Sequence, residues 1–293
     1  MLWGVSTRVN AIGALIIAAT MWGFIWYPLR LLEEGGLHGL GSSLFMYTGT
    51  FLAALYLLRG RCGEFRYAPI SLFIIGLTVG WTNIAFILAI LEGTVLRVLL
   101  LFYLSPIWAI LFARIILGER ITLRVWGVLF IAMTGALIML WHEESSVPYP
   151  QNTADWYALT SGISFAMSNV MMRKTQAVSI QVKTVTGWFG VVILASVILL
   201  FKQSSIINAV NPYMILFAIL LGATFIVVMT LSVVYGVSHL PVHQSAIILL
   251  FELVVGAVSS MILTDESVLM REWFGGALVL SAAYFAARES TSG

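Results

Sequence analysis

Long apolar stretches separated by short polar segments dominate the chain. Ten of these stretches approach the length of about 20 mostly apolar residues that one bilayer-crossing helix needs. Their approximate ranges are 10–30, 42–58, 69–91, 95–117, 122–141, 155–175, 184–201, 212–236, 243–264 and 272–288. Because lipid offers no hydrogen-bond partner to backbone groups, we expect each stretch to be a helix. The predicted fold is therefore an all-α integral membrane protein with ten transmembrane helices.

Composition supports a membrane protein. Of the 293 residues, 60% are hydrophobic and only 10% are charged, whereas a soluble domain has about 25% charged residues. The ten stretches leave no room for a soluble domain of ordinary size. The first stretch is too long for the apolar core of a signal peptide and ends in Pro28 and Arg30, so we expect it to remain as a helix. The single cysteine, Cys62, excludes an intramolecular disulfide.

Two parts of the chain resemble each other without a gap. Residues 81–128 align with residues 228–275. Identical residues in this register include Trp126 with Trp273, Glu119 with Glu266, and Arg124 with Arg271. Each copy holds five predicted helices, an odd number, so the two copies must be inverted in the membrane, as is common in transporters. We expect a first repeat at residues 1–142, a polar linker at 143–153 and a second repeat at 154–293.

Positive charge predicts the orientation. With ten helices both termini lie on one side, and that side collects most of the basic residues: Arg8, Arg59, Arg61, Arg66, Arg114, Arg120, Arg124, Arg173, Lys174, Lys183 and Arg288. The positive-inside rule therefore places both termini in the cytoplasm. The basic residues are scattered, so we expect no nucleic-acid partner. The lipid bilayer is the expected surrounding, and no obligate protein partner is evident.

Several short motifs in order resemble a known family. They are Trp22-Gly23, Leu104-Ser105-Pro106, Leu117-Gly118-Glu119-Arg120 and Trp126-Gly127, followed in the second half by Glu252, Glu266, Trp273 and Gly275. This set resembles the EamA-type repeat of the drug/metabolite transporter superfamily, and its size and aromatic content are most similar to the YddG-type amino-acid exporters. One departure is Leu253, where the family often has proline. The resemblance implies ten helices around a central cavity, with the fifth and tenth more peripheral, and export of small metabolites.

Glu252 is the most costly side chain for the membrane to accommodate. It lies about nine residues into the ninth predicted helix, where a charge costs about 2.5–3.5 kcal/mol on insertion scales. It could bind a substrate ammonium, carry a proton, or hydrogen-bond a neighbouring helix. Helical spacing places Gln244 on the same face, and their repeat mates are Arg97 and Ser105. Arg97 would suit a substrate carboxylate, although its place in the first turn favours extension toward the interface.

Aromatic and polar side chains at mid-depth are further candidates for a substrate cavity. They are Trp22, Trp81, Tyr103, Phe165 and Trp188, together with Asn83, Ser164, Ser168 and Asn169. Aromatic walls suit amino-acid side chains and ammonium groups, but each such residue alone more often packs between helices. On an ideal helix Tyr103 and Ser105 point about 200° apart, so we expect only one to face a cavity. Pro106 should kink its helix and act as a pivot.

The chain has no visible pattern for enzyme chemistry. It contains no GxxxxGK[ST], HExxH or CxxC sequence, so we expect no nucleotide-driven step, metal or other cofactor, and no enzyme. The predicted function is a secondary transporter that exports small metabolites, including aromatic or apolar amino acids, by alternating access. One alternative is a proton-coupled exporter of hydrophobic cations or other metabolites, with Glu252 as a shared proton and cation site. Another is an intramembrane enzyme or a sensor without transport.

Overall fold

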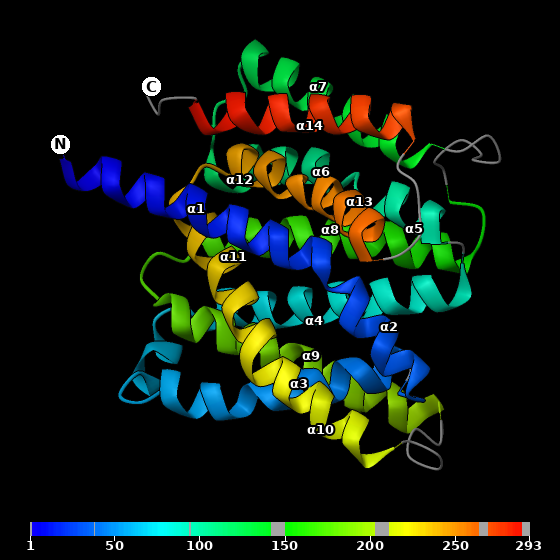
Figure 1. Cartoon of the computed structure of the whole chain (residues 1–293). Coiled ribbons are helices and arrows are strands. Elements are labelled where there is room, and N and C mark those ends of the chain that lie inside the picture. The colour runs from blue at the N-terminus through cyan, green and yellow to red at the C-terminus, as the bar shows by residue number, and fades with distance from the viewer. Residues whose placement is uncertain are drawn as a thin grey trace.

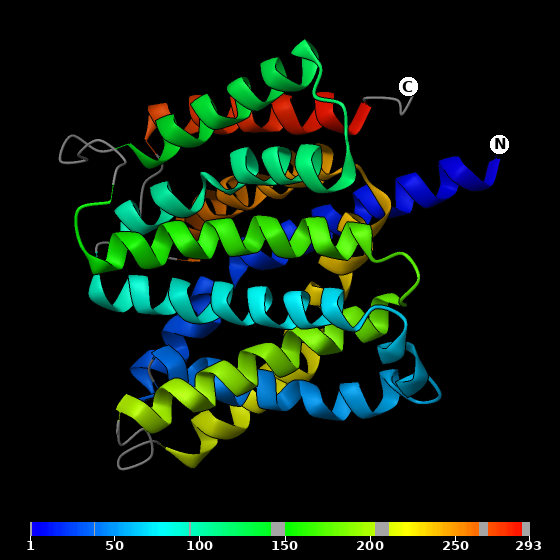
Figure 2. The same cartoon turned by 180° about the vertical axis from the view of Figure 1, so that it is seen from behind.

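The computed structural model describes residues 2–37, 39–93, 95–141, 150–202, 211–263 and 269–288. Every regular element in these ranges is helical, as the all-α prediction requires. The helices form a layered bundle in which most run roughly alongside one another, and the start of α1 and the end of α14 lie at the same end of the bundle (Figures 1 and 2). Most of the predicted linker, residues 143–149, and the motif residue Glu266 lie outside the described residues.

Nine elements precede the predicted linker in the described part of the chain. They are α1 (Leu2–Phe24), α2 (Trp26–Glu34), α3 (Gly39–Leu57), the short 3₁₀ helix η1 (Cys62–Arg66), α4 (Pro69–Glu92), α5 (Val95–Phe102), α6 (Ser105–Phe112), the π-helical turn η2 (Ala113–Leu117) and α7 (Leu123–Leu140). Apolar residues fill most positions of the long helices, because a helix surrounded by lipid and by other helices is apolar on all sides.

Eight elements follow the predicted linker in the described part of the chain. They are α8 (Thr153–Lys174), α9 (Ile180–Lys202), α10 (Pro212–Leu221), the π-helical turn η3 (Gly222–Ile226), α11 (Val227–His239), α12 (Val242–Leu249), α13 (Phe251–Leu263) and α14 (Met270–Arg288). Consecutive elements such as α10, η3 and α11 continue one another along the bundle, as do α12 and α13 (Figure 1).

Within the described residues, eight helical stretches are long and apolar enough to cross a bilayer. They are Thr7–Glu34, Gly39–Leu57, Pro69–Glu92, Arg97–Leu117, Leu123–Leu140, Ile180–Phe201, Pro212–His239 and Val242–Leu263. Each overlaps one of the ten predicted stretches. The other two predictions coincide with α8 and α14, which are helices of 22 and 19 residues with charged side chains near their ends. A topology of ten spans remains a prediction.

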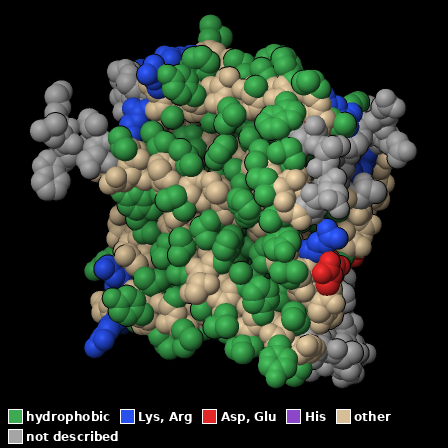
Figure 3. Space-filling model, in the orientation of Figure 1, with side chains coloured by type: hydrophobic (Ala, Val, Ile, Leu, Met, Phe, Trp, Pro, Cys, Tyr) green, Lys and Arg blue, Asp and Glu red, His purple; other side chains and the backbone are tan. Residues whose placement is uncertain are grey.

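The outer surface of the bundle is apolar. Leu55, Ile115, Phe130 and Leu200 are each more than 70% exposed. In Figure 3 hydrophobic side chains cover most of the face in view, and the charged side chains lie toward its edges. An apolar surface of this extent is far larger than a soluble monomer exposes. It fits a protein surrounded by lipid, with its charges near the two membrane surfaces.

Glycines allow the closest helix crossings in the interior. The helix α4 packs against both α8 and α9, whereas α7 and α14 pair with each other at one edge of the bundle (Figures 1 and 2). A side chain at Gly190 of α9 would overlap the carbonyl group of Gly76 on α4. Small residues at such crossings let two backbones approach, which is a main source of helix association in membranes.

A buried lysine joins the last turns of two helices. Lys183 on α9 is only 1% exposed. Its Nζ donates to the carbonyl oxygen of Met172 on α8 at 3.0 Å and to Oγ of Ser238 on α11 at 2.7 Å. Arg173 donates to the carbonyl of the same serine at 2.8 Å. Cations interact favourably with the negative ends of helices, so these two side chains stabilise the C-termini of α8 and α11.

Glu64, in the loop before α4, holds the segment that precedes α9. Its Oε2 accepts a hydrogen bond from the backbone N–H of Ser179 at 2.7 Å. Burial acts to raise the pKa of this carboxyl, but the hydrogen bonds from Ser179 and the charge of Arg61 outweigh it, so the pKa lies below its usual value of 4.5. The contact therefore joins residues 115 positions apart in the sequence through a carboxylate that favours its charged form.

Candidate functional site

Two membrane helices are interrupted at matching places. The first breaks at Tyr103 and Leu104, between α5 and α6, directly before Pro106. Proline lacks the N–H that a continuous helix requires and its ring clashes with the preceding turn. The second breaks at Leu250, between α12 and α13, where the backbone N–H of Leu253 bonds to the carbonyl of Leu250 at 3.1 Å. The repeat register pairs Tyr103 with Leu250, although only the first break contains a proline.

A small cavity lies where these breaks meet α8. Residues from α5 to α6, α8, and α12 to α13 line it: Phe102, Tyr103, Ser105, Pro106, Ala109, Phe165, Asn169, Ala246, Leu249, Leu250 and Glu252. Its volume is ≈ 10 Å³, about the space that one water needs. The cavity therefore joins both halves of the chain, and in this structure it is closed to anything much larger than water.

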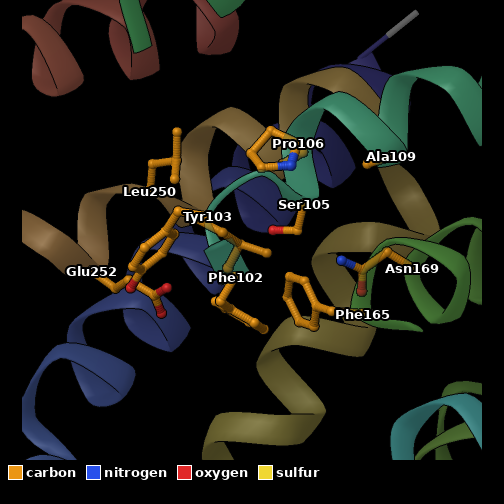
Figure 4. Close-up of a pocket in the computed structure, with 11 residues that line it drawn as sticks. Phe102, Tyr103, Ser105, Pro106, Ala109, Phe165, Asn169, Leu250 and Glu252 are labelled. Carbon is orange, nitrogen blue, oxygen red and sulfur yellow. The ribbon is translucent and has the colours of Figure 1, made fainter. Parts of the chain in front are cut away.

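At one end of the cavity Glu252 faces Tyr103. Figure 4 shows the phenol hydroxyl of Tyr103 next to the carboxylate of Glu252, where it can donate a hydrogen bond. Glu252 also lies in the first turn of α13, where the positive end of the helix dipole stabilises an anion. Glu252 is the only charged side chain among the described residues that line the cavity. The helix break thus explains how a carboxylate is accommodated so deep in an apolar bundle.

Two unpaired polar side chains lie on the other side of the cavity. Ser105 and Asn169 are 5% and 4% exposed. Neither the hydroxyl nor the amide has a hydrogen-bond partner among the described residues. In Figure 4 the amide of Asn169 extends from α8 toward Phe165, whereas the hydroxyl of Ser105 points toward the side of Tyr103 and Phe102. Both residues line the cavity, so each can bind a polar atom of a ligand there.

Aromatic rings form the wall between these two polar ends. The ring centroids of Phe102 and Phe165 lie 5.7 Å apart, and those of Phe102 and Tyr103 lie 5.5 Å apart. In Figure 4 the two phenylalanine rings lie below Ser105 and between the Glu252 end and Asn169. The cavity therefore combines one carboxylate, two neutral polar groups and an apolar wall.

The structure brings together six of the candidate residues. The cavity is lined by Tyr103, Ser105, Pro106, Phe165, Asn169 and Glu252. The expectation that Tyr103 and Ser105 could not both face it is wrong. That expectation assumed a continuous helix, and the interruption between the two residues turns their side chains toward the same space.

The other predicted residues lie away from the cavity: Trp22, Trp81, Asn83, Arg97, Ser164, Trp188 and Gln244. Several of them connect helices instead. The ring of Trp81 packs edge-on against Tyr157, with centroids 6.3 Å apart. Asn83 accepts a hydrogen bond from the hydroxyl of Tyr47 at 2.9 Å, and Nε1 of Trp188 donates to Thr230 at 3.0 Å. In this structure these side chains belong to the helix packing around the cavity.

Arg97 forms a buried ion pair. Its Nε lies 2.8 Å from both carboxylate oxygens of Asp155, whose side chain is only 2% exposed. Asp155 also accepts from the backbone N–H of Gln151 at 2.7 Å. The guanidinium charge is therefore compensated inside the protein, where it joins α5 to the start of α8. The alternatives from sequence, a substrate carboxylate or the membrane interface, did not include this partner.

Gln244 does not line the cavity, although Glu252 does. The spacing of eight residues assumed one continuous helix, but the break at Leu250 separates α12 from α13. Gln244 is 1% exposed within α12. Asn169, by contrast, lines the cavity, and one signal favoured it. It lies four residues after Phe165, so both occupy the same face of α8.

Comparison with known families finds a match in the second half of the chain. Residues 152–288 match the EamA-like transporter family. The second half of the chain carries an EamA-like transporter domain. The matched range contains α8 to α14 and thus Phe165, Asn169 and Glu252 of the cavity. Together with the apolar helices, it identifies the chain as a multi-pass membrane protein.

Solved structures contain the same fold. A protein known from a crystal structure superposes with a TM-score of 0.74 over 95% of this chain and 96% of its own, at 16% sequence identity. At that identity the similarity shows the fold alone. No curated protein matches the chain in sequence.

Proposed function

We propose that the protein is a secondary transporter that exports small metabolites, in particular amino acids with aromatic or apolar side chains. Two inverted five-helix repeats, residues 1–142 and 154–293, would alternate in opening the cavity to either side of the inner membrane. The EamA-like domain supports a transporter of small molecules. The transmembrane arrangement that we propose has ten spans with both termini in the cytoplasm.

The observation that carries this proposal is the composition of the cavity. A carboxylate, a phenol, a hydroxyl and an amide surround a space walled by two phenylalanines. Binding sites for small molecules combine a mostly apolar wall with a few placed polar groups in this way. The cavity also lies at the breaks of two membrane helices, the place where many secondary transporters bind substrate.

The same breaks support alternating access. A helix without its continuous backbone hydrogen bonds can bend at the break at lower cost than elsewhere. Pro106 keeps the first break from closing, and we propose that it serves as the pivot. Bending at two matched positions would open the cavity, now closed, to one side at a time.

Counterflow in liposomes tests the function. The purified full chain is reconstituted, loaded with unlabelled L-phenylalanine and diluted into labelled L-phenylalanine. We expect labelled substrate to accumulate transiently above its equilibrium level, because exchange on one carrier is faster than net loss. A Ser168→Ala variant, in which a hydroxyl bonded only within its own helix is removed, should keep this activity. Uptake no faster than in protein-free liposomes, for every amino acid of a broad panel, would contradict the proposal.

A second candidate function rests on Glu252. As the only charge on the described lining of the cavity, it could exchange a proton for a hydrophobic cation. A Glu252→Gln variant tests this second candidate. Facilitated amino-acid exchange that is unchanged in rate and in pH dependence would exclude Glu252 from coupling. Loss of a proton-driven flux of hydrophobic cations would favour the second candidate.

A further inference from the structure

We propose that the cavity is a two-ended site for a free α-amino acid, in which Ser105 at the start of α6 and Asn169 of α8 bind the substrate's carboxylate. Glu252 at the start of α13 and Tyr103 beside it bind its ammonium. The inference rests on the proposed transport of amino acids and assigns a separate subsite to each charge of the substrate.

The carboxylate subsite follows from the start of α6. Ser105 is the first residue of this eight-residue helix. Pro106 has no N–H, and the N–H groups of Ile107 and Trp108 bond to the carbonyl of Leu104, so the N–H of Ser105 is the first-turn backbone donor that remains for a ligand among the described residues. The positive end of the helix dipole favours an anion there. The hydroxyl of Ser105 and the amide of Asn169 add side-chain donors, both buried and both unpaired among the described residues. A carboxylate would satisfy all of these groups at once.

The matched start of α13 shows why only one end is free for an anion. Ser105 and Glu252 occupy equivalent positions in the repeat register. At α13 the protein supplies its own carboxylate, Glu252, in the first helical turn. At α6 the equivalent side chain is a neutral hydroxyl. One helix start is therefore already neutralised, and the other is open to a negative charge from the substrate.

The ammonium subsite follows from the pair at the other end. An ammonium has three donors, and Glu252 can accept from it while Tyr103 keeps or exchanges its own hydrogen bond to the carboxylate. Arg97, which might otherwise bind the substrate carboxylate, is held by Asp155 at 2.8 Å. The apolar side chain of the substrate would contact Phe102 and Phe165, which lie between the two subsites (Figure 4).

Three probes that differ only in charge test this assignment. L-Phenylalanine carries both charges, phenethylamine only the ammonium, and 3-phenylpropionate only the carboxylate. Binding of each probe to the purified full chain in nanodiscs is measured, and flux is measured separately in liposomes. We expect the wild type to bind phenylalanine at least about tenfold more tightly than either single-charge probe, since one hydrogen bond to a charged group contributes that much.

Asn169→Asp is the decisive variant. It preserves size and places a negative charge beside the proposed carboxylate subsite. We expect it to weaken phenylalanine binding by about tenfold or more and to leave phenethylamine binding unchanged or stronger. Ser105→Ala should act in the same direction more weakly, whereas Glu252→Gln should weaken phenylalanine and phenethylamine together. Ser168→Ala, on the same helix as Asn169 and equally buried, is the matched control and should change none of these affinities.

The outcomes separate this inference from the proposed function. If Asn169→Asp weakens phenylalanine and phenethylamine equally, the carboxylate subsite is wrong, even when the wild type transports. If phenylalanine binds with the expected pattern but no probe crosses the membrane, the subsite stands and transport is contradicted. If the wild type binds phenethylamine as tightly as phenylalanine, the inference is also wrong, because no group would then be recognising the carboxylate.

Discussion

Replacing Asp155 by asparagine should destabilise the protein strongly. The change keeps the shape of the side chain but removes the charge that compensates Arg97. In the wild type the Asp155 side chain is 2% exposed and the Arg97 side chain 16% exposed, with Nε 2.8 Å from each carboxylate oxygen. The variant leaves the Arg97 guanidinium, largely enclosed by protein, without the negative charge of Asp155.

The expected loss follows from this burial. Breaking one side of a buried pair costs about 3–5 kcal/mol, because the remaining charge stays desolvated. Since Arg97 retains some exposure and the new amide could still accept one hydrogen bond, we expect the lower end, about 3 kcal/mol. The matched control is the exposed pair Arg30–Glu34, whose side chains are 58% and 60% exposed at 3.0 Å. Glu34→Gln should cost less than about 0.5 kcal/mol.

Reversible unfolding of the detergent-solubilised protein, followed by circular dichroism, measures both changes. A further variant checks the cause: adding Arg97→Met to Asp155→Asn removes the uncompensated charge and should restore most of the lost stability. The reasoning is refuted if Asp155→Asn costs no more than Glu34→Gln. It is also refuted if Arg97→Met fails to rescue, since the loss would then have another origin.

Three further predictions concern the frame of the bundle. Gly190→Ala should cost about 2–3 kcal/mol, because the new methyl would overlap a backbone carbonyl of α4, whereas Gly127→Ala, with open space around it, should be neutral or stabilising in the same unfolding assay. Lys183→Met should lower stability by about 1–3 kcal/mol, because buried acceptors at two helix ends would lose their hydrogen-bond donor. Lys174→Met, at an exposed lysine, is its control. Equal effects of the two variants would contradict the role of Lys183. The pKa of Glu64 is lowered, so the stabilising contribution of this carboxylate is complete above pH 4.5 and is lost as the pH falls through the lowered pKa. Glu64→Gln should therefore flatten the pH dependence of stability in that window. An unchanged profile would contradict this role of Glu64.

Most of the helices can be predicted from the sequence, because the thickness of the bilayer fixes the length of each apolar stretch. The eight stretches found long and apolar enough all coincide with predicted ones. The more polar helices α8 and α14 were also predicted, as the apolar stretches 155–175 and 272–288. The break before Pro106 followed from the missing N–H of proline. The break at Leu250 was not predicted, because its helix contains no proline at that place.

The residues of the site were harder to predict from the sequence than the helices, for a physical reason. Helical periodicity assigns faces only along an unbroken helix. It therefore predicted that Tyr103 and Ser105 could not both face a cavity, which is wrong, and it grouped Gln244 with Glu252, although only Glu252 lines the cavity. Pairing across the bundle is also invisible to local patterns. The partner of Arg97 lies 58 residues away in the sequence. For aromatic residues such as Trp188, the sequence pattern is the same whether the ring lines a cavity or packs between two helices.

The most direct test of the central claim is the accessibility of the cavity from the two sides of the membrane. Cys62 is the only cysteine in the chain, so Ser105→Cys in a Cys62→Ser background places a single thiol in the cavity. A membrane-impermeant thiol reagent is added on either side of oriented vesicles, with and without L-phenylalanine. The account predicts that the thiol reacts from each side and that phenylalanine slows both reactions. A thiol that reacts from neither side in a folded protein, or from both sides at rates unaffected by any amino acid, would contradict it.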